Sequence, residues 1–146
     1  MIKVTFYDEI EDSKLDFAVI VARTAGKWVF CKHRERDTFE VPGGHRELGE
    51  TIMETARREL YEETGAINYQ IEKVCVYSVA SEKEETFGML YVADIEEFEQ
   101  ELHSEIEAVY VFDELPDKWT YPLIQPLLIK EYEKRFENHI ENLRGN

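Results

Sequence analysis

Three glutamates in one short segment carry most of the chemistry that this sequence offers. Glu59, Glu62 and Glu63 lie within residues 43–66. On a helix, at 100° per residue, they occupy an arc of roughly 100° on one face. Like charges at these spacings repel one another, so their crowding is favourable only beside a cation. Carboxylate oxygens suit the hard ions Mg²⁺ and Mn²⁺, which complete their shells with water and phosphate oxygens. The segment therefore predicts a divalent-metal site.

The helix that must position these glutamates is marked at both ends. Thr51, followed three residues later by Glu54, forms a capping-box pattern at the start of a helix. Gly65 suits the left-handed conformation that ends a helix, so we predict a helix over residues 52–64. A neighbouring apolar face of this helix comprises Met53, Ala56 and Leu60. The helix is therefore expected to pack by one side and to present its carboxylates beside that contact.

A second interpretation of the segment is a solvated, glutamate-rich helix stabilised by intrahelical ion pairs, of which Arg58 with Glu62 would be one. This interpretation does not account for the Pro42-Gly43-Gly44 turn before the helix. It also leaves unexplained why three glutamates share one arc with a single arginine beside them. We therefore favour the metal site.

The whole segment resembles the Nudix box, the Gly-x5-Glu-x7-Arg-Glu-U-x-Glu-Glu-x-Gly-U signature of the Nudix hydrolases, in which U is an aliphatic residue. The matching residues are Gly44, Glu50, Arg58, Glu59, Leu60, Glu62, Glu63, Gly65 and Ala66. From average residue frequencies, such a match arises by chance in roughly one chain of this length in 10⁷. Ala66 stands where the family more often has a larger aliphatic residue, which affects packing more than chemistry.

The resemblance implies a Nudix-type α/β/α sandwich that binds Mg²⁺ or Mn²⁺ and hydrolyses a nucleoside diphosphate linked to another group. The implied metal ligands are the carbonyl of Gly43 and the carboxylates of Glu59, Glu62 and Glu63. Arg58 would orient a carboxylate. Glu47 and Glu50 would support the metal ligands without binding the metal themselves. A non-catalytic Nudix-like module that only binds nucleotides is expected to show damage in the box, and this chain shows none.

The residue that takes the proton from the attacking water is not determined by the box, because relatives recruit this base from different places. Glu59 and Glu62 are candidates within the box. Four further candidates lie outside it, in a loop or at strand edges: Glu84, Glu85, Glu105 and Glu107. Each of these four is more often solvated surface than catalytic.

Composition limits the remaining possibilities. A chain of 146 residues with 43% apolar and 12% aromatic content fits one domain, over residues 1–146. A formal net charge of −15 argues against a general nucleic-acid or anionic-membrane binder. The longest apolar run, residues 17–22, is too short to cross a membrane, and the N-terminus lacks a signal-peptide pattern, so we expect a cytoplasmic protein. Cys31 and Cys75 lie in strand-like stretches and are expected to be buried thiols.

An acidic protein needs local positive charge to capture a polyphosphate. Lys32 and Arg34, shortly before the Pro42 turn, are our candidates for phosphate contacts. The alternative is a solvated loop in which these side chains pair with Glu35 and Asp37.

Alternating apolar residues predict a hairpin before the box and two or more strands after it. The predicted strands cover residues 3–7, 17–23, 27–31, 68–79, 86–93 and 108–112, with a turn at Ala25-Gly26. From about Pro122 an apolar stripe predicts a long amphipathic helix, with Pro126 in its first turn. The stripe comprises Ile124, Leu127, Leu128, Tyr132, Phe136 and Ile140.

The small size and the position of the box resemble the MutT-like nucleoside triphosphate pyrophosphohydrolases, some of which act on 8-oxo-dGTP and release a nucleoside monophosphate and pyrophosphate. An alternative is removal of pyrophosphate from the 5′ end of RNA. The sequence gives less support to hydrolysis of ADP-ribose or of dinucleoside polyphosphates. Residues 80–84 lack the proline or tyrosine that these classes of hydrolase are expected to carry downstream of the box. Four aromatic residues could stack on a base or belong to the core: Tyr77, Phe87, Trp119 and Tyr121. The oligomeric state stays open.

Overall fold

A mixed sheet forms the middle layer of the computed structural model. The structure describes the backbone of residues 1–99 and 106–144 and the side chains of residues 1–99 and 109–136. The elements in chain order are β1 (Lys3–Tyr7), the 3-10 helix η1 (Asp12–Lys14), β2 (Leu15–Thr24), β3 (Lys27–His33), β4 (Gly43–His45), α1 (Ile52–Thr64), β5 (Ala66–Ala80), β6 (Glu85–Phe98), β7 (Ile106–Phe112) and α2 (Gln125–Arg144). The strand order is β1-β5-β6-β2-β3-β7, with β4 paired to β2. Strands β2 and β6 are parallel, and the other pairs are antiparallel.

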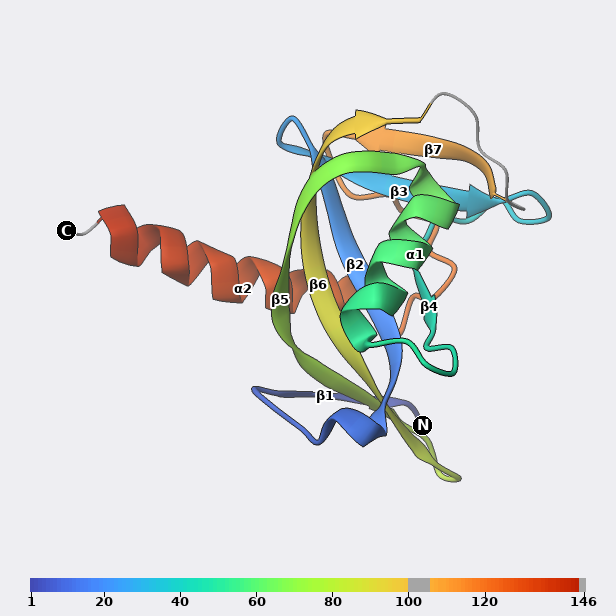
Figure 1. The fold of residues 1–146 in the computed structure, drawn as a ribbon, viewed down its shortest axis with the longest axis vertical. Helices are drawn as coiled ribbons and strands as arrows, with labels where there is room; N and C mark the ends of the chain where they lie inside the picture. The colour runs from blue at the N-terminus through green and yellow to red at the C-terminus, as the bar shows by residue number, and fades with distance from the viewer. Residues whose placement is uncertain (100–105, 145–146) are drawn as a thin grey trace.

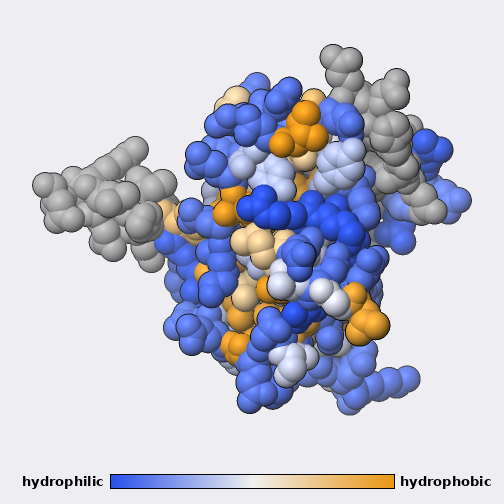
Figure 2. All heavy atoms as spheres, viewed as in Figure 1, coloured by the Kyte–Doolittle hydropathy of each residue, from blue (hydrophilic) through white to orange (hydrophobic). Residues whose placement is uncertain are grey.

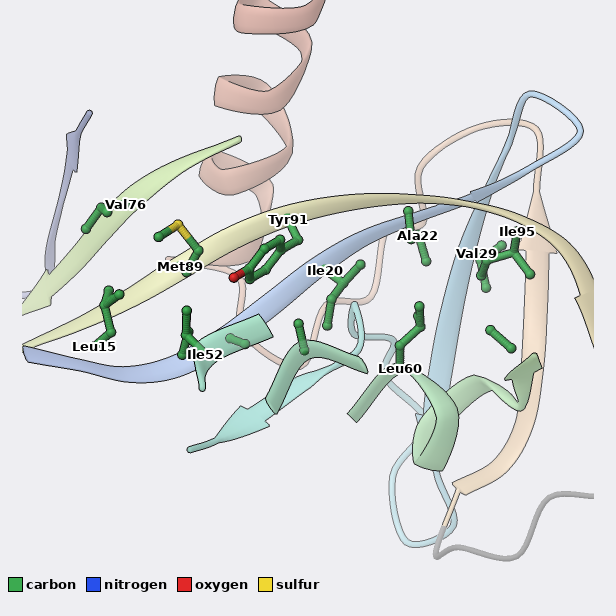
Figure 3. Packing of buried hydrophobic residues seen from close by; sticks show 14 residues of the cluster. Leu15, Ile20, Ala22, Val29, Ile52, Leu60, Val76, Met89, Tyr91 and Ile95 are labelled. Carbon is green, nitrogen blue, oxygen red and sulfur yellow. The ribbon is translucent and has the colours of Figure 1, made fainter. Parts of the chain in front are cut away.

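Strand β2 is apolar on both faces because it lies between two hydrophobic clusters. Ala18 and Ile20 belong to the cluster that packs against α1, whereas Val21 faces the cluster that includes Leu128 of α2. Figure 3 shows Ile20 and Leu60 on facing elements of the first cluster. The central strand is therefore held from both sides, which gives the elements beside it a rigid support.

The two helices cover opposite faces of the sheet, which confirms the predicted α/β/α sandwich (Figure 1). Helix α1 lies across one face, and α2 starts on the other face and extends away from the sheet. The face that carries α1 is largely hydrophilic (Figure 2). Across the described parts of the chain, neither helix combines the length and apolar character needed to cross a membrane. Cys31 and Cys75 are free, buried thiols, as expected.

Most predicted elements are present, and several strands are longer than predicted. The helix over residues 52–64 is confirmed, and so is the turn at Ala25-Gly26, where both residues have positive φ. The box glycines were predicted to form only a turn; instead Gly43–His45 form β4, whose partners on β2 are Phe17, Ala18 and Val19. Backbone hydrogen bonding by β2 therefore extends to the glycines of the box.

The C-terminal helix begins later than predicted. It starts at Gln125 rather than near Pro122, and Pro126 lies in its first turn as expected. Leu127 is 42% exposed, and Ile129 takes the buried place beside Leu128. The predicted stripe residue Ile140 has a side chain outside the described residues.

Candidate active site

The ends of α1 determine where its glutamates lie. The Thr51 hydroxyl accepts a hydrogen bond from the Glu54 N–H at 3.1 Å, and the Glu54 carboxylate accepts one from the Thr51 N–H at 2.8 Å. At the other end, Gly65 has φ of 76° and donates its N–H to the Tyr61 carbonyl. Both caps satisfy backbone groups that would otherwise lack partners, so both ends of the helix are fixed.

Arg58 is the centre of an ion-pair network on α1. Its Nε lies 2.6 Å from Glu50 Oε2, and its Nη1 lies 2.8 Å from Glu59 Oε1 and 3.4 Å from Glu62 Oε2. Arg58 Nη2 also donates to the carbonyl of His45, at the end of β4. These bonds raise the pKa of the guanidinium, first through the hydrogen bond to Glu50. Arg58 therefore ties α1 to β4 and orients the Glu59 carboxylate.

The Glu50 carboxylate binds Arg58 and two further hydrogen-bond donors. Besides Arg58, its carboxylate accepts hydrogen bonds from the Thr55 hydroxyl at 2.8 Å and from the Glu47 N–H at 2.9 Å. The bond to Arg58, followed by the Glu47 N–H, lowers the pKa of Glu50 to about 2. Glu47 itself lies 3.7 Å from Arg58. Both glutamates thus contact the arginine that binds Glu59, and their supporting role at a metal site stays a prediction.

Glu63 faces β4 instead of the solvent. Its Oε1 accepts a hydrogen bond from the N–H of Gly43 at 2.8 Å, which places the Gly43 peptide next to the carboxylate. Burial raises the pKa of Glu63 well above its ordinary value, the Gly43 N–H opposes this rise, and the charge of Glu59 adds to it. The Glu59 carboxylate is therefore close enough to disfavour the ionisation of Glu63.

Close approach of the β2 backbone leaves no room for a side chain on Gly43, and a side chain on Gly44 would displace the Glu59 carboxylate. A Cβ on Gly43 would lie 2.6 Å from the carbonyl oxygen of Ala18, and one on Gly44 would lie 2.5 Å from Cδ of Glu59. No real Cβ tolerates such contacts. The absence of side chains lets β4 lie against β2 on one side and against the Glu59 carboxylate on the other.

The donor set fits a hard divalent cation, although the side chains do not yet converge on one point. Within the described residues, no three acidic, His or Cys side chains form a ready metal-binding group. The reason lies in their present partners, because Arg58 engages Glu59 and Glu62 while the Gly43 N–H holds Glu63. Oxygen donors alone are the chemistry that Mg²⁺ and Mn²⁺ favour, and a cation here would offset the burial and the Glu59 charge that raise the pKa of Glu63.

The predicted phosphate contacts lie at the end of β3. Lys32 donates its Nζ to the carbonyl of Arg36 at 3.0 Å, and Arg34 is exposed in the segment that follows β3. Lys32 thus supports the local turn. A role for either side chain in phosphate binding stays a prediction.

Two of the additional base candidates, Glu84 and Glu85, lie away from the box. Glu84 and Glu85 lie at the tip of the β5–β6 hairpin, where Glu85 accepts a hydrogen bond from Ser78. Glu85 is four residues before Met89, which pairs with Ala18 opposite Gly44. That separation is roughly 13 Å along the strand. Glu105 lies outside the described residues, and so does the side chain of Glu107.

A pocket of about 250 Å³ lies between β2, β4 and the start of α2. It is lined by Phe17, Val19, Glu40, Val41, Gly43, Gly44, His45, Tyr121, Ile124, Gln125 and Leu128. The ring centroids of Phe17 and His45 are 4.4 Å apart, and Tyr121 is 43% exposed. Small-molecule sites are commonly apolar, with a few polar groups that orient the ligand, and this pocket has that character.

Among the predicted aromatic candidates, only Tyr121 lines this pocket. Trp119 packs on Phe30 with 5.4 Å between ring centroids, Tyr77 is buried, and Phe87 contacts Tyr7. These three side chains belong to the core, because they pack on other apolar groups.

Four residues near the site were not identified from the sequence. Phe17 and His45 form a ring pair, and Glu40 is a buried carboxylate whose pKa is raised by burial. Gln125 is a buried amide in the first turn of α2. A polar residue inside an apolar helical stripe is the signal that would have singled out Gln125. The others depend on contacts between strands that are distant in sequence.

Comparison with known proteins agrees with the geometry. The family model for the NUDIX domain matches residues 12–131. A Bacillus subtilis (strain 168) protein, YtkD, which carries the provisional name of an 8-oxo-dGTP diphosphatase, is 31% identical over 117 residues, covering 80% of this chain and 73% of YtkD.

Two solved structures show the same fold. A mutant of the Bacillus subtilis pyrophosphohydrolase BsRppH is 26% identical, with a TM-score of 0.76 and coverage of 91% of this chain and 90% of that one. The NUDIX domain of Shewanella oneidensis NrtR, complexed with ADP-ribose, has a TM-score of 0.65 at 16% identity, covering 84% and 88%. Nudix hydrolases generally use divalent metal ions and act on nucleotide-type substrates. Its intact box, its fold and these similarities show that the chain belongs to the Nudix hydrolase family.

Proposed function

We propose that this enzyme is a nucleoside triphosphate pyrophosphohydrolase that uses Mg²⁺ or Mn²⁺ and releases a nucleoside monophosphate and pyrophosphate. The observation that carries the proposal is the arrangement around β4. Gly43 and Gly44 line the pocket and also contact Glu63 and Glu59 of α1. One nucleotide can therefore place its base in the pocket and its phosphates beside the carboxylates.

Some residues of the chain would bind the metal ion, and others orient the carboxylates that bind it. Glu59, Glu62, Glu63 and the carbonyl of Gly43 are the proposed metal ligands. A bound divalent cation neutralises phosphate charge and lowers the pKa of an attacking water. Arg58 and Glu50 orient Glu59 through their 2.8 Å and 2.6 Å contacts. Glu59 or Glu62 accepts the proton from the water.

Two observations support a mononucleotide as the substrate. The similarity to YtkD supports an oxidised guanine nucleotide such as 8-oxo-dGTP as the first substrate to test. The pocket volume of about 250 Å³ suits one base, which favours a mononucleotide over a dinucleoside polyphosphate. Phe17, His45 and Tyr121 supply the aromatic surface on which a base can stack.

A second candidate is removal of pyrophosphate from triphosphorylated RNA. The similarity to BsRppH supports it, since that protein is described as a pyrophosphohydrolase. The net charge of −15 disfavours a long RNA track. A single 5′-terminal nucleotide, however, needs only the same pocket and the same carboxylates.

The test is product analysis with a panel of substrates. The panel contains canonical and oxidised nucleoside triphosphates, ADP-ribose, a dinucleoside tetraphosphate and 5′-triphosphorylated RNA, each with Mg²⁺, Mn²⁺ or EDTA. We expect metal-dependent release of pyrophosphate from a nucleoside triphosphate. Preferential turnover of RNA would replace the first candidate by the second, and turnover of neither would contradict both.

A further inference from the structure

Arg46 directly follows β4, and its side chain binds two separate segments of the backbone. Its Nε donates a hydrogen bond to the carbonyl of Glu50 at 2.8 Å, at the end of the loop that precedes α1. Its Nη1 donates to the carbonyls of Asp12 at 2.9 Å and Leu15 at 3.3 Å, where η1 leads into β2. Its Nη2 forms an ion pair with the Asp12 carboxylate at 2.9 Å. One guanidinium therefore ties the loop before α1 to the start of β2.

The loop between β4 and α1 ends at Glu50, one residue before the N-cap of the helix. It contains a turn in which the Glu50 N–H donates to the Glu47 carbonyl at 3.1 Å and Gly49 has φ of 85°. Residues before an N-cap lie outside the hydrogen-bond ladder of the helix, so bonds to side chains and to other segments determine where they lie. The Arg46 side chain supplies such a bond to the Glu50 carbonyl, and the Arg46 N–H donates to the Asp16 carbonyl at 2.7 Å. The position of Glu50 therefore depends on Arg46.

A short series of contacts leads from Glu50 to the carboxylates of α1. The Glu50 carboxylate lies 2.6 Å from Arg58, and Arg58 lies 2.8 Å from Glu59. Across the described part of the chain, Arg46 is bonded to none of the proposed metal ligands. Any effect of Arg46 on the reaction must therefore pass through Glu50. Such an effect can be large, because a displacement of about 1 Å in a reacting group lowers turnover on the order of 10²-fold.

The shape of the arginine side chain suits this position better than that of another cation. The planar guanidinium directs its donors in several fixed directions, whereas the ammonium of lysine is a compact point charge on a flexible stem. Asp12 and Leu15 are more than 30 residues from Arg46 in the chain. Water can replace hydrogen bonds that a lysine variant loses, because the Arg46 side chain is 21% exposed, but water does not hold two segments at a fixed separation. Replacement by lysine therefore keeps the charge and removes the bridge.

We infer that Arg46 is a positioning residue for the hydrolytic reaction, which fixes Glu50 and through Arg58 orients the Glu59 carboxylate. The inference rests on the proposed function for the role of Glu59 as a metal ligand. Arg46 does not line the pocket in which the base is proposed to bind. Its replacement should therefore weaken metal binding and lower kcat, and leave the affinity for a nucleoside monophosphate in EDTA unchanged.

Arg46→Lys is the variant that tests this inference, and Arg135→Lys is its matched control. Arg135 is a partly exposed arginine on α2, across the sheet from α1. It forms ion pairs with Glu131 at 2.7 Å and with Asp8 at 3.2 Å, so it also ties two segments that are distant in the chain. The same chemical change is therefore made at a comparable bridge away from the carboxylates.

Three readouts are compared for the native chain and the two variants. They are kcat at saturating Mg²⁺, the affinity for Mn²⁺ by titration calorimetry, and the affinity for a nucleoside monophosphate in EDTA. Arg46→Lys should lose at least about tenfold in kcat and in Mn²⁺ affinity, as expected when a residue that supports metal ligands is replaced. Arg135→Lys should keep native values of both. The affinity for the monophosphate should be equal in all three proteins.

The outcomes distinguish this inference from the proposed function. If the native chain hydrolyses no nucleoside triphosphate, and Arg46→Lys but not Arg135→Lys weakens Mn²⁺ binding, the proposed function fails and the inference stands. Native kcat and native Mn²⁺ affinity in Arg46→Lys would overturn the inference. Equal losses in the two variants would also overturn it, because they would indicate a general loss of stability. Absence of Mn²⁺ binding in the native chain would contradict both proposals.

Thermal unfolding shows whether each variant keeps the fold. If either variant is partly unfolded, all three proteins are compared in trimethylamine N-oxide, which favours the folded state. The comparison of Arg46→Lys with Arg135→Lys then decides the inference by the same criteria.

Discussion

Substitution of Gly44 by alanine tests whether the space beside Glu59 matters for chemistry. The added Cβ would lie 2.5 Å from Cδ of Glu59, so the carboxylate must move. That movement breaks the 2.8 Å contact with Arg58 and displaces a proposed metal ligand. Gly44 itself does not have a positive φ, so alanine meets no backbone strain there.

The expected effect on stability is modest. Loss of a hydrogen bond between charged groups costs about 1.5–3 kcal/mol. Replacement of glycine by alanine in an ordinary backbone conformation returns about 0.4–1 kcal/mol through the unfolded state. The free energy of unfolding of Gly44→Ala should therefore fall by about 1–2 kcal/mol, as measured by urea denaturation.

Gly26→Ala is the matched control. Gly26 has φ of 78° in the β2–β3 turn, and an added Cβ would meet nothing within 4 Å. The left-handed conformation costs a residue other than glycine about 1–2 kcal/mol, so both variants should lose similar stability. Only Gly44→Ala should lose metal affinity and turnover, by at least about tenfold. Equal turnover in the two variants would refute the placement of Glu59 at a metal site.

Three further predictions concern other parts of the molecule. Glu62→Gln and Glu63→Gln should each reduce kcat at saturating Mg²⁺ by at least about tenfold, and unchanged kcat would show that the carboxylate is not a ligand. Lys32→Ala and Arg34→Ala should raise KM for a triphosphate several-fold if they hold phosphate; an unchanged KM would assign them to a solvated loop. Because the pKa of Glu63 is raised in the folded protein, its contribution to stability is present below the ordinary pKa and is lost as pH rises toward the raised value. The Tm in EDTA should therefore fall over this interval, and the fall should be smaller in Glu63→Gln or with Mg²⁺; identical pH profiles in EDTA would contradict this role of Glu63.

Local patterns in the sequence were sufficient for α1. The capping box, the glycine at the helix end and the apolar face are all interactions between residues near in sequence, so the helix over residues 52–64 was predictable. The three glutamates and Arg58 were identifiable for the same reason, because they are spaced on that helix. The glycines of β4 were recognised, but their strand was not. Its partner is β2, more than twenty residues earlier in the chain.

The set of residues that line the pocket is decided by the tertiary structure. Phe17, His45 and Gln125 are distant in sequence, and they meet because β2 pairs with β4 and α2 packs across the same face. The sequence could not assign Tyr77, Phe87 and Trp119 to the core, since an aromatic residue in a strand or loop is equally compatible with a core or a binding surface.

The sequence by itself determined the family of this protein and the chemistry of its box, because residues on one helix are placed relative to one another by helix geometry. Only the tertiary structure decided what lies opposite that helix. The Val41 N–H that holds Gln125 and the Gly43 N–H that holds Glu63 belong to one short segment that leads into β4. Their partners are separated by long stretches of chain, and their contacts exist only because the sheet packs between the two helices.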